Sequence, residues 1–272
     1  MSRSIPPEII DLIVDNLEDR QSALRACCLV SKSWVPRCRV HLFARVRFTN
    51  SSIESWVKTF PDPSNSPAHY TRSLTFRGRW FLTDAGPVVA RRIRAFPFHN
   101  VAHLTLGFKP SSGLVSLVPF HGLLPTIRSL RLEFTCIRPS EVLGLACSFP
   151  LLEDLALFPF SYWIEVDRGI PPPTSPRLTG SLQLHSMGGG MSHITRWLLN
   201  LPNGLNFTKI ALLCVDEEID FNSATDLVSR CSDTLESLDV SEYLPGVFFF
   251  FSFPAPDRHL IAEFRHVHGG FD

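Results

Sequence analysis

The sequence predicts an α/β protein in which a short helical segment precedes a solenoid of strand–helix units. Three observations lead to this class: amphipathic helical patterns near the N-terminus, a pair of alternating apolar residues that recurs eight times at nearly equal steps, and helical periodicity between several of those pairs. We expect residues 1–44 to form the helical domain, residues 45–245 the array, and residues 246–272 a low-complexity or poorly ordered tail.

The first helix is predicted to begin at Pro6 and Pro7, since a proline in the first turn loses no intrahelical hydrogen bond. Ile9, Ile13 and Leu17 then follow four residues apart, and Ile10 widens the apolar stripe that they form. Residues with this spacing lie on one side of a helix, so the helix is expected to have one apolar face.

A polar break and a second helical stretch complete the segment. Residues 18–21 are expected to turn the chain, and residues 23–34 have the pattern of one or two short helices with little polar surface. A segment of about 30 residues cannot bury so many large apolar side chains by itself. We therefore expect it to pack against a partner protein.

A motif runs through this segment. The motif begins with an apolar residue and a proline, followed by a glutamate and two aliphatic residues. One leucine then closes the first helix and another opens the next helix. The motif ends in a sequence similar to Val-Ser-Lys-x-Trp. The segment thereby resembles the F-box family, in which this surface docks on the Skp adaptor of a cullin–RING ubiquitin ligase. The resemblance implies that the docking residues are Ile5, Pro6, Pro7, Glu8, Ile9, Ile10, Ile13, Leu17, Leu24, Leu29, Val30 and Trp34. The alternative is an ordinary helical hairpin that belongs to a larger core.

Short alternating apolar pairs divide the rest of the chain. The steps between their first members are 28, 30, 26, 25, 27, 28 and 28 residues. Six of the eight residues that stand three positions before the pairs are also apolar, the exceptions being Thr71 and Thr179. The pairs are Val46/Phe48, Leu74/Phe76, Leu104/Leu106, Leu130/Leu132, Leu155/Leu157, Leu182/Leu184, Ile210/Leu212 and Leu238/Val240.

Stretches with helical periodicity lie between several pairs, at residues 53–60, 142–149, 194–201 and 227–231. A strand and a helix in every unit of about 20–29 residues is typical of leucine-rich repeats, so the array resembles that family in a degenerate form. The resemblance implies units that stack on their neighbours, because one unit cannot bury its own apolar face. A doubly wound α/β domain is the alternative, since βαβ units have a similar length.

The candidate binding surface is the outward side of the predicted strands. Residues that flank each strand leucine are expected to point away from the core, because side chains alternate between the two faces of a strand. We expect this surface to hold a protein substrate. The candidate contacts are Arg45, Arg47, Arg77, His103, Arg131, Glu133, Asp154, Lys209 and Asp239.

The charge balance argues against nucleic-acid and membrane partners. Basic residues (Lys and Arg) number 26 and acidic residues also number 26, so no net field attracts a polyanion. The N-terminus shows no secretory signal pattern, and no apolar run is long enough to span a bilayer. The seven cysteines include no C-x-x-C pair, and reduced thiols in the cytoplasm and/or nucleus are expected.

One constellation has some features of an enzyme. Ser186 followed by Gly188 resembles half of the G-x-S-x-G elbow of α/β-hydrolases, but Leu184 replaces the first glycine. A catalytic triad would also need one of two aspartates and one of two histidines, Asp216 or Asp220 and His259 or His266. His266 and His268 lack partners at metal-ligand spacing. We expect no catalytic site, metal or cofactor.

Together these observations predict a non-catalytic adaptor. The helical segment is expected to dock on the Skp adaptor of a cullin–RING ligase, and the array to present an unknown protein substrate for ubiquitin transfer. An interaction solenoid outside the ubiquitin system is the alternative, and a serine hydrolase using Ser186 is a remote one.

Overall fold

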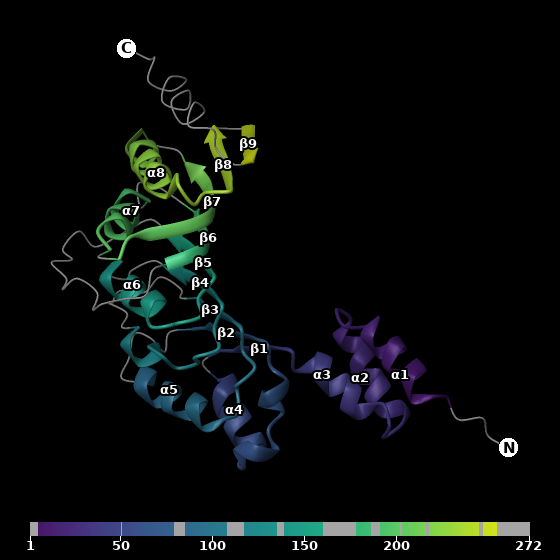
Figure 1. Cartoon of the computed structure of the whole chain (residues 1–272). Coiled ribbons are helices and arrows are strands. Elements are labelled where there is room, and N and C mark those ends of the chain that lie inside the picture. The colour runs from purple at the N-terminus through teal and green to yellow at the C-terminus, as the bar shows by residue number, and fades with distance from the viewer. Residues whose placement is uncertain are drawn as a thin grey trace.

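The computed structural model describes residues 5–49, 51–78, 85–107, 117–134, 139–159, 178–185, 191–201, 203–215, 218–244 and 247–254. Within these residues the α/β class is confirmed. Three helices come first, and a nine-stranded sheet follows in which the order of the strands is their order in the chain. Helices α4 to α8 lie along one side of the sheet, and the N-terminal helices project from its β1 end (Figure 1).

The N-terminal helices are α1 (Pro7–Asp15), α2 (Gln21–Val30) and α3 (Val35–Leu42). They enclose a small core of Ile10, Val14, Leu24 and Cys38, which is separate from the core of the sheet. The apolar stripe predicted for the first helix is present, and the structure divides it into a buried and an exposed part. Ile10 and Val14 point into the core, whereas Ile9 and Ile13 beside them are exposed.

The strands are β1 (Arg45–Phe48), β2 (Ser73–Arg77), β3 (His103–Gly107), β4 (Ser129–Phe134), β5 (Asp154–Pro159), β6 (Leu178–His185), β7 (Leu205–Val215), β8 (Ser237–Leu244) and β9 (Val247–Pro254). Strands β1 to β8 are parallel, and each pairs with the next. All eight predicted apolar pairs lie in these strands and align in register: Val46 stands opposite Leu74, and Leu74 opposite Leu104. The sequential order differs from that of a doubly wound sheet, whose order reverses at a switch point.

A ladder of backbone hydrogen bonds joins the turns that precede the strands. The carbonyl oxygen of Ala44 accepts hydrogen bonds from the N–H groups of Arg72 and Ser73, at 2.8 and 2.9 Å. The same pair of bonds recurs one unit later at the carbonyl of Arg72, and again at those of Ala102 and Arg128. Main-chain hydrogen bonds from each unit therefore fix the position at which the strand of the next unit begins.

The helices of the array are α4 (Ser52–Thr59), α5 (Ala85–Ala95), α6 (Pro139–Cys147), α7 (Met191–Leu199) and α8 (Glu218–Cys231), with short 3-10 turns η1 (Pro63–Asn65), η2 (Pro67–Tyr70) and η4 (Val118–Phe120). The four stretches predicted from helical periodicity overlap α4, α6, α7 and α8. Their apolar side chains and the strand leucines form one continuous core. The period of the apolar residues therefore predicted these helices correctly.

The sixth unit departs from the repeat. Thr179 occupies the position expected on the core side, yet it is exposed and Leu178 is buried instead. In the same unit the register of β6 against β7 shifts between Gly180 and Ser181.

The C-terminal tail was expected to be of low complexity or poorly ordered from residue 246. Residues 247–254 of it form β9, which pairs antiparallel with β8. Two antiparallel strands need only a short connection, and only residues 245 and 246 separate β8 from β9. Residues 255–272 lie outside the described part of the chain.

Candidate functional site

Large aliphatic side chains are exposed on α1 and α2. On α1, Ile9, Leu12 and Ile13 are 46%, 59% and 39% exposed. On α2, Leu29 and Val30 are 88% and 67% exposed. We use the name apolar face for the exposed aliphatic side chains of α1, of α2 and of the residue before α1, namely Ile5, Ile9, Leu12, Ile13, Leu29 and Val30.

Four residues predicted to contact a partner lie inside the helical domain instead. Ile10 and Leu24 are buried in its core, and Leu17 and Trp34 are half-buried against that core. In this structure their side chains hold the three helices together. They therefore support the apolar face from behind rather than form part of it.

Leu12 was missed by the sequence prediction. It stands between Ile9 and Ile13 at the i, i+3, i+4 spacing of one helix face, so the signal was present in the sequence. The predicted residues 6–8 are exposed at the start of α1, next to this face.

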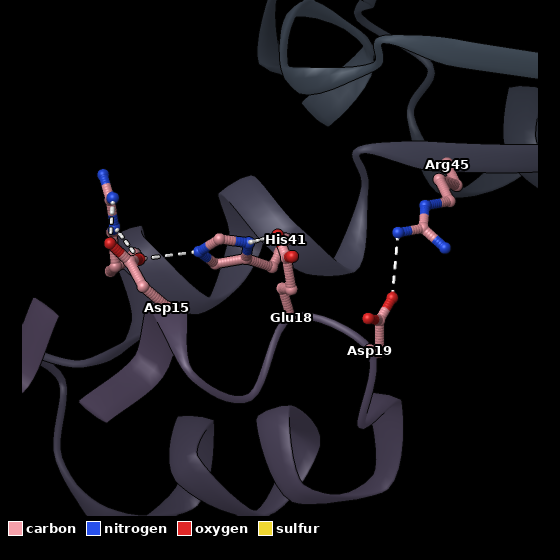
Figure 2. Close-up of polar contacts among 6 residues, drawn as sticks. Asp15, Glu18, Asp19, His41 and Arg45 are labelled. Atoms are coloured by element: carbon pink, nitrogen blue, oxygen red, sulfur yellow. Dashed lines mark hydrogen bonds and ion pairs between the residues drawn. The ribbon is translucent and has the colours of Figure 1, made fainter. Parts of the chain in front are cut away.

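Asp15, at the end of α1, joins α1 to α3 (Figure 2). Its carboxylate oxygens accept hydrogen bonds from Nε and Nη2 of Arg37, both at 2.6 Å. Nε2 of His41 lies 2.8 Å from Oδ1 of Asp15, and Nδ1 of the same ring lies 4.0 Å from Oε2 of Glu18. A guanidinium group that binds a carboxylate at two points holds it in a defined orientation. The network therefore sets the angle between the helix that carries the apolar face and the helix that leads into the sheet.

This network predicts a dependence on pH. The hydrogen bonds from Arg37 and then from His41 lower the pKa of Asp15 from 3.8 to about 2. Since the folded carboxyl binds its proton less tightly than the unfolded one, the stabilisation is complete above the unfolded pKa and is lost as the pH falls toward 2. The Asp15 side chain is 39% exposed, so screening by solvent limits the contribution to about 1 kcal/mol.

We expect an NMR titration of the Asp15 carboxyl to show a midpoint near 2, and Arg37→Gln to raise it toward 3.8. Asp15→Asn should remove this part of the acid dependence of unfolding. The same midpoint with and without the Arg37 guanidinium would contradict the prediction.

Arg45 connects the N-terminal helices to the sheet. Its Nη2 lies 2.9 Å from Oδ1 of Asp19, in the turn between α1 and α2 (Figure 2). Both side chains are largely exposed, so the pair adds little stability. Arg45 was predicted to contact a substrate, and its largely exposed guanidinium lies at the junction with the helices.

The outward side of the sheet, which we call the strand face, carries the other candidate residues. Arg47, Arg77, His103, Arg131, Asp154 and Lys209 are exposed there, and Glu133 and Asp239 are half-buried. The structure brings together the candidates on β1 to β4, where Arg47 and Arg131 share one row of the sheet. Lys209 on β7 and Asp239 on β8 lie several strands away.

Glu133 organises the centre of the strand face. Its Oε2 accepts a hydrogen bond from Nη2 of Arg77 at 2.9 Å, and its Oε1 accepts one from Nε of Arg131 at 2.8 Å. The guanidinium carbon of Arg131 lies 4.0 Å from the ring centroid of Phe158, whose ring meets that of His185 edge-on at 5.3 Å between centroids. Burial, and then the charge of Arg131, lower the pKa of His185, so this imidazole is neutral at pH 7. Phe158 was missed although strand alternation places it on this face.

Of the residues considered for a hydrolase, the structure describes only Asp220, in the first turn of α8. Ser186, Asp216, His259 and His266 lie outside the described residues, as does His268. Within the described ranges, no three His, Cys, Asp or Glu side chains are grouped so as to hold a metal ion. Burial raises the pKa of the Cys38 thiol to about 12, which keeps it protonated and unreactive at neutral pH. In the same ranges, no helix has both the length and the apolar character that a bilayer crossing requires.

Two comparisons with known proteins found no relative. No protein-family model matches the chain. No curated protein matches it either. Function is therefore inferred from the motif in residues 5–34 and from the geometry of the two faces.

Proposed function

We propose that this protein is the substrate-recognition adaptor of a ubiquitin ligase of the Skp–cullin–F-box type. The N-terminal helices act as the F-box, whose apolar face docks on the Skp adaptor. The array acts as a leucine-rich-repeat-like solenoid that binds a protein substrate on its strand face. The chain itself performs no chemistry: it raises the local concentration of a target lysine near the conjugating enzyme, in the cytoplasm and/or nucleus.

The observation that carries the proposal is the apolar face. Ile10 and Val14 supply the apolar side chains that α1 buries in its own domain, and Ile9 and Ile13 leave the adjacent part of the same apolar stripe exposed. Large aliphatic side chains gathered on a surface mark a site of protein interaction. The exposed residues also belong to the sequence motif, with the addition of Leu12.

The arrangement of the array supports the second half of the proposal. Helices α4 to α8 lie along one side of the sheet (Figure 1). Most outward side chains of strands β1 to β4 are charged or polar. A broad polar surface on a rigid sheet suits the binding of a protein segment.

Ile9→Asp combined with Ile13→Asp tests the docking half. Both side chains are exposed, so the replacements should leave the fold intact. Burying two carboxylates in an apolar interface costs several kcal/mol, so we expect the affinity for purified Skp adaptor to fall by at least about a hundredfold. Biolayer interferometry on the full chain measures this loss.

Val118→Asp combined with Leu151→Asp is the matched control, because these array side chains are 60% and 47% exposed. This variant should bind the Skp adaptor as the unmodified chain does. Failure of the unmodified, folded chain to bind the Skp adaptor would contradict the proposal. That result would favour an interaction solenoid outside the ubiquitin system.

A further inference from the structure

The centre of the strand face is built around one carboxylate that holds two arginines. Arg77, Gly107 and Glu133 occupy one row on β2, β3 and β4. The Arg77 side chain passes over Gly107 to reach Glu133, and a Cβ at Gly107 would lie 3.2 Å from Cγ of Arg77 and 3.3 Å from Oε2 of Glu133. The glycine therefore leaves the space in which this ion pair crosses a strand.

Arg131 is held on two sides. Glu133 accepts a hydrogen bond from its Nε, and the ring of Phe158 lies against its guanidinium group. Within the described residues its two Nη nitrogens donate no hydrogen bond, so they are available to an anion. A guanidinium already fixed by a carboxylate and a ring loses little conformational entropy when it binds.

Arg47 supplies a second cation on the same row of the sheet. It is exposed, and it forms no ion pair with any described residue. Thr75 and Thr105 stand between Arg47 and Arg131 in register, and both are half-buried. Three arginines against one glutamate give this part of the strand face a net positive charge.

We propose that this part of the strand face binds an extended acidic segment of a partner protein, which lies across β1 to β4 with one carboxylate on Arg47 and a second on Arg131. The proposal rests on the substrate-binding role proposed for the array and specifies the class of substrate. The hydroxyl groups of Thr75 and Thr105 donate hydrogen bonds to the segment between its two carboxylates. Glu133 acts as a positioning residue, because it holds Arg131 without occupying its Nη atoms.

The register determines the spacing of the two carboxylates. Three strand steps of about 4.8 Å separate Arg47 from Arg131, which amounts to about 14 Å. Residues i and i+4 of an extended peptide are about 13 Å apart and lie on the same side of it. Acidic residues four positions apart therefore match the two arginines.

Selection of a random 12-residue peptide library on the full chain tests this proposal. We expect the selected peptides to be enriched in Asp or Glu pairs at positions i and i+4. Selection of peptides with no acidic enrichment, or with acidic residues at no preferred spacing, would overturn it. Equal binding of a selected peptide and a single-stranded oligonucleotide would also overturn it, because that result indicates attraction to any polyanion.

Arginine variants locate the bound peptide. Arg47→Ala and Arg131→Ala should each weaken a selected, fluorescently labelled peptide by about tenfold in fluorescence anisotropy, which corresponds to one lost charge-assisted contact. Arg91→Ala and Arg92→Ala are the matched controls, since both arginines are exposed on α5 and removing them changes the net charge equally. Equal weakening by the strand-face and control variants would overturn the proposal.

The variant Glu133→Gln tests whether Glu133 positions the two arginines or whether only the net charge of the strand face attracts the acidic peptide. This variant makes the strand face more positive, so simple attraction predicts tighter binding of the acidic peptide. Positioning predicts weaker binding, because the amide holds the two guanidinium groups less firmly. Tighter binding would overturn the assigned role of Glu133.

Binding to the Skp adaptor, measured in parallel, distinguishes this proposal from the broader one. A chain that binds the Skp adaptor but shows no acidic preference overturns the substrate class alone. A chain that selects i, i+4 acidic peptides but does not bind the Skp adaptor overturns the ligase role and leaves the peptide site supported.

Discussion

Gly180→Ala is expected to destabilise the array by more than about 3 kcal/mol. Gly180 has a φ of +81°, and a Cβ there would lie 2.0 Å from the carbonyl oxygen of Glu153. That oxygen also accepts a hydrogen bond from the N–H group of Ser181 at 2.7 Å, within the ladder that joins the strand entries. Relief of the clash therefore requires the ladder to open at this unit. Urea unfolding followed by circular dichroism measures the loss.

Gly204→Ala is the matched control for this prediction. Gly204 has a φ of +72°, but a Cβ there would meet no atom within 4 Å. Only the cost of the left-handed backbone remains, about 1–2 kcal/mol. Equal destabilisation by the two variants would contradict the role assigned to the contact with Glu153.

Phe48→Ala is expected to cost about 3–5 kcal/mol, as for a large aromatic side chain removed from a packed core. Phe48 is 2% exposed, at the end of β1. Its ring packs edge-on against Trp56 and Phe98, at centroid distances of 5.5 and 6.2 Å, and it lies 5.7 Å from the ring of Phe76. The residue thus joins β1 to the next strand and to α4, so its loss should loosen the first two units.

Hydrogen exchange shows where this loosening occurs. In Phe48→Ala the amides of β1 and β2 should lose protection before those of β5 to β7, because each unit of the array depends on its neighbours. Phe48→Leu keeps most of the volume and should cost less than about 2 kcal/mol. A loss below about 1 kcal/mol for Phe48→Ala would contradict the prediction.

The strands of the array could be predicted because each one leaves a local pattern. Two apolar residues at positions i and i+2, as in Val46 and Phe48, mark the buried side of a short strand. The shift at Gly180 could not be predicted in this way, since it depends on how closely two backbones approach. The phenylalanine run 248–251 was predicted to belong to a low-complexity tail. The run forms strand β9 by pairing with the edge of β8, and no local pattern in the run indicates that partner.

The functional residues were harder to predict, because they depend on contacts between distant parts of the chain. Ile9 and Ile10 are neighbours in sequence, yet the packing of α2 and α3 buries one and exposes the other. The partners of Asp15 lie 22 and 26 residues away, and no local pattern links them. Glu133 reaches Arg77 across an intervening strand, which requires a glycine on that strand.

The connection between α3 and β1 affects where a bound target lies relative to the N-terminal helices. Only two residues separate these elements, and the second of them, Ala44, accepts the first hydrogen bonds of the backbone ladder. A connection this short, held by hydrogen bonds at its second residue, limits how far the N-terminal helices can turn relative to the sheet. In the proposed ligase, a target bound to the strand face is therefore held within a narrow range of positions relative to the conjugating enzyme. Lysines are then chosen by their position on the target rather than by the sequence around them.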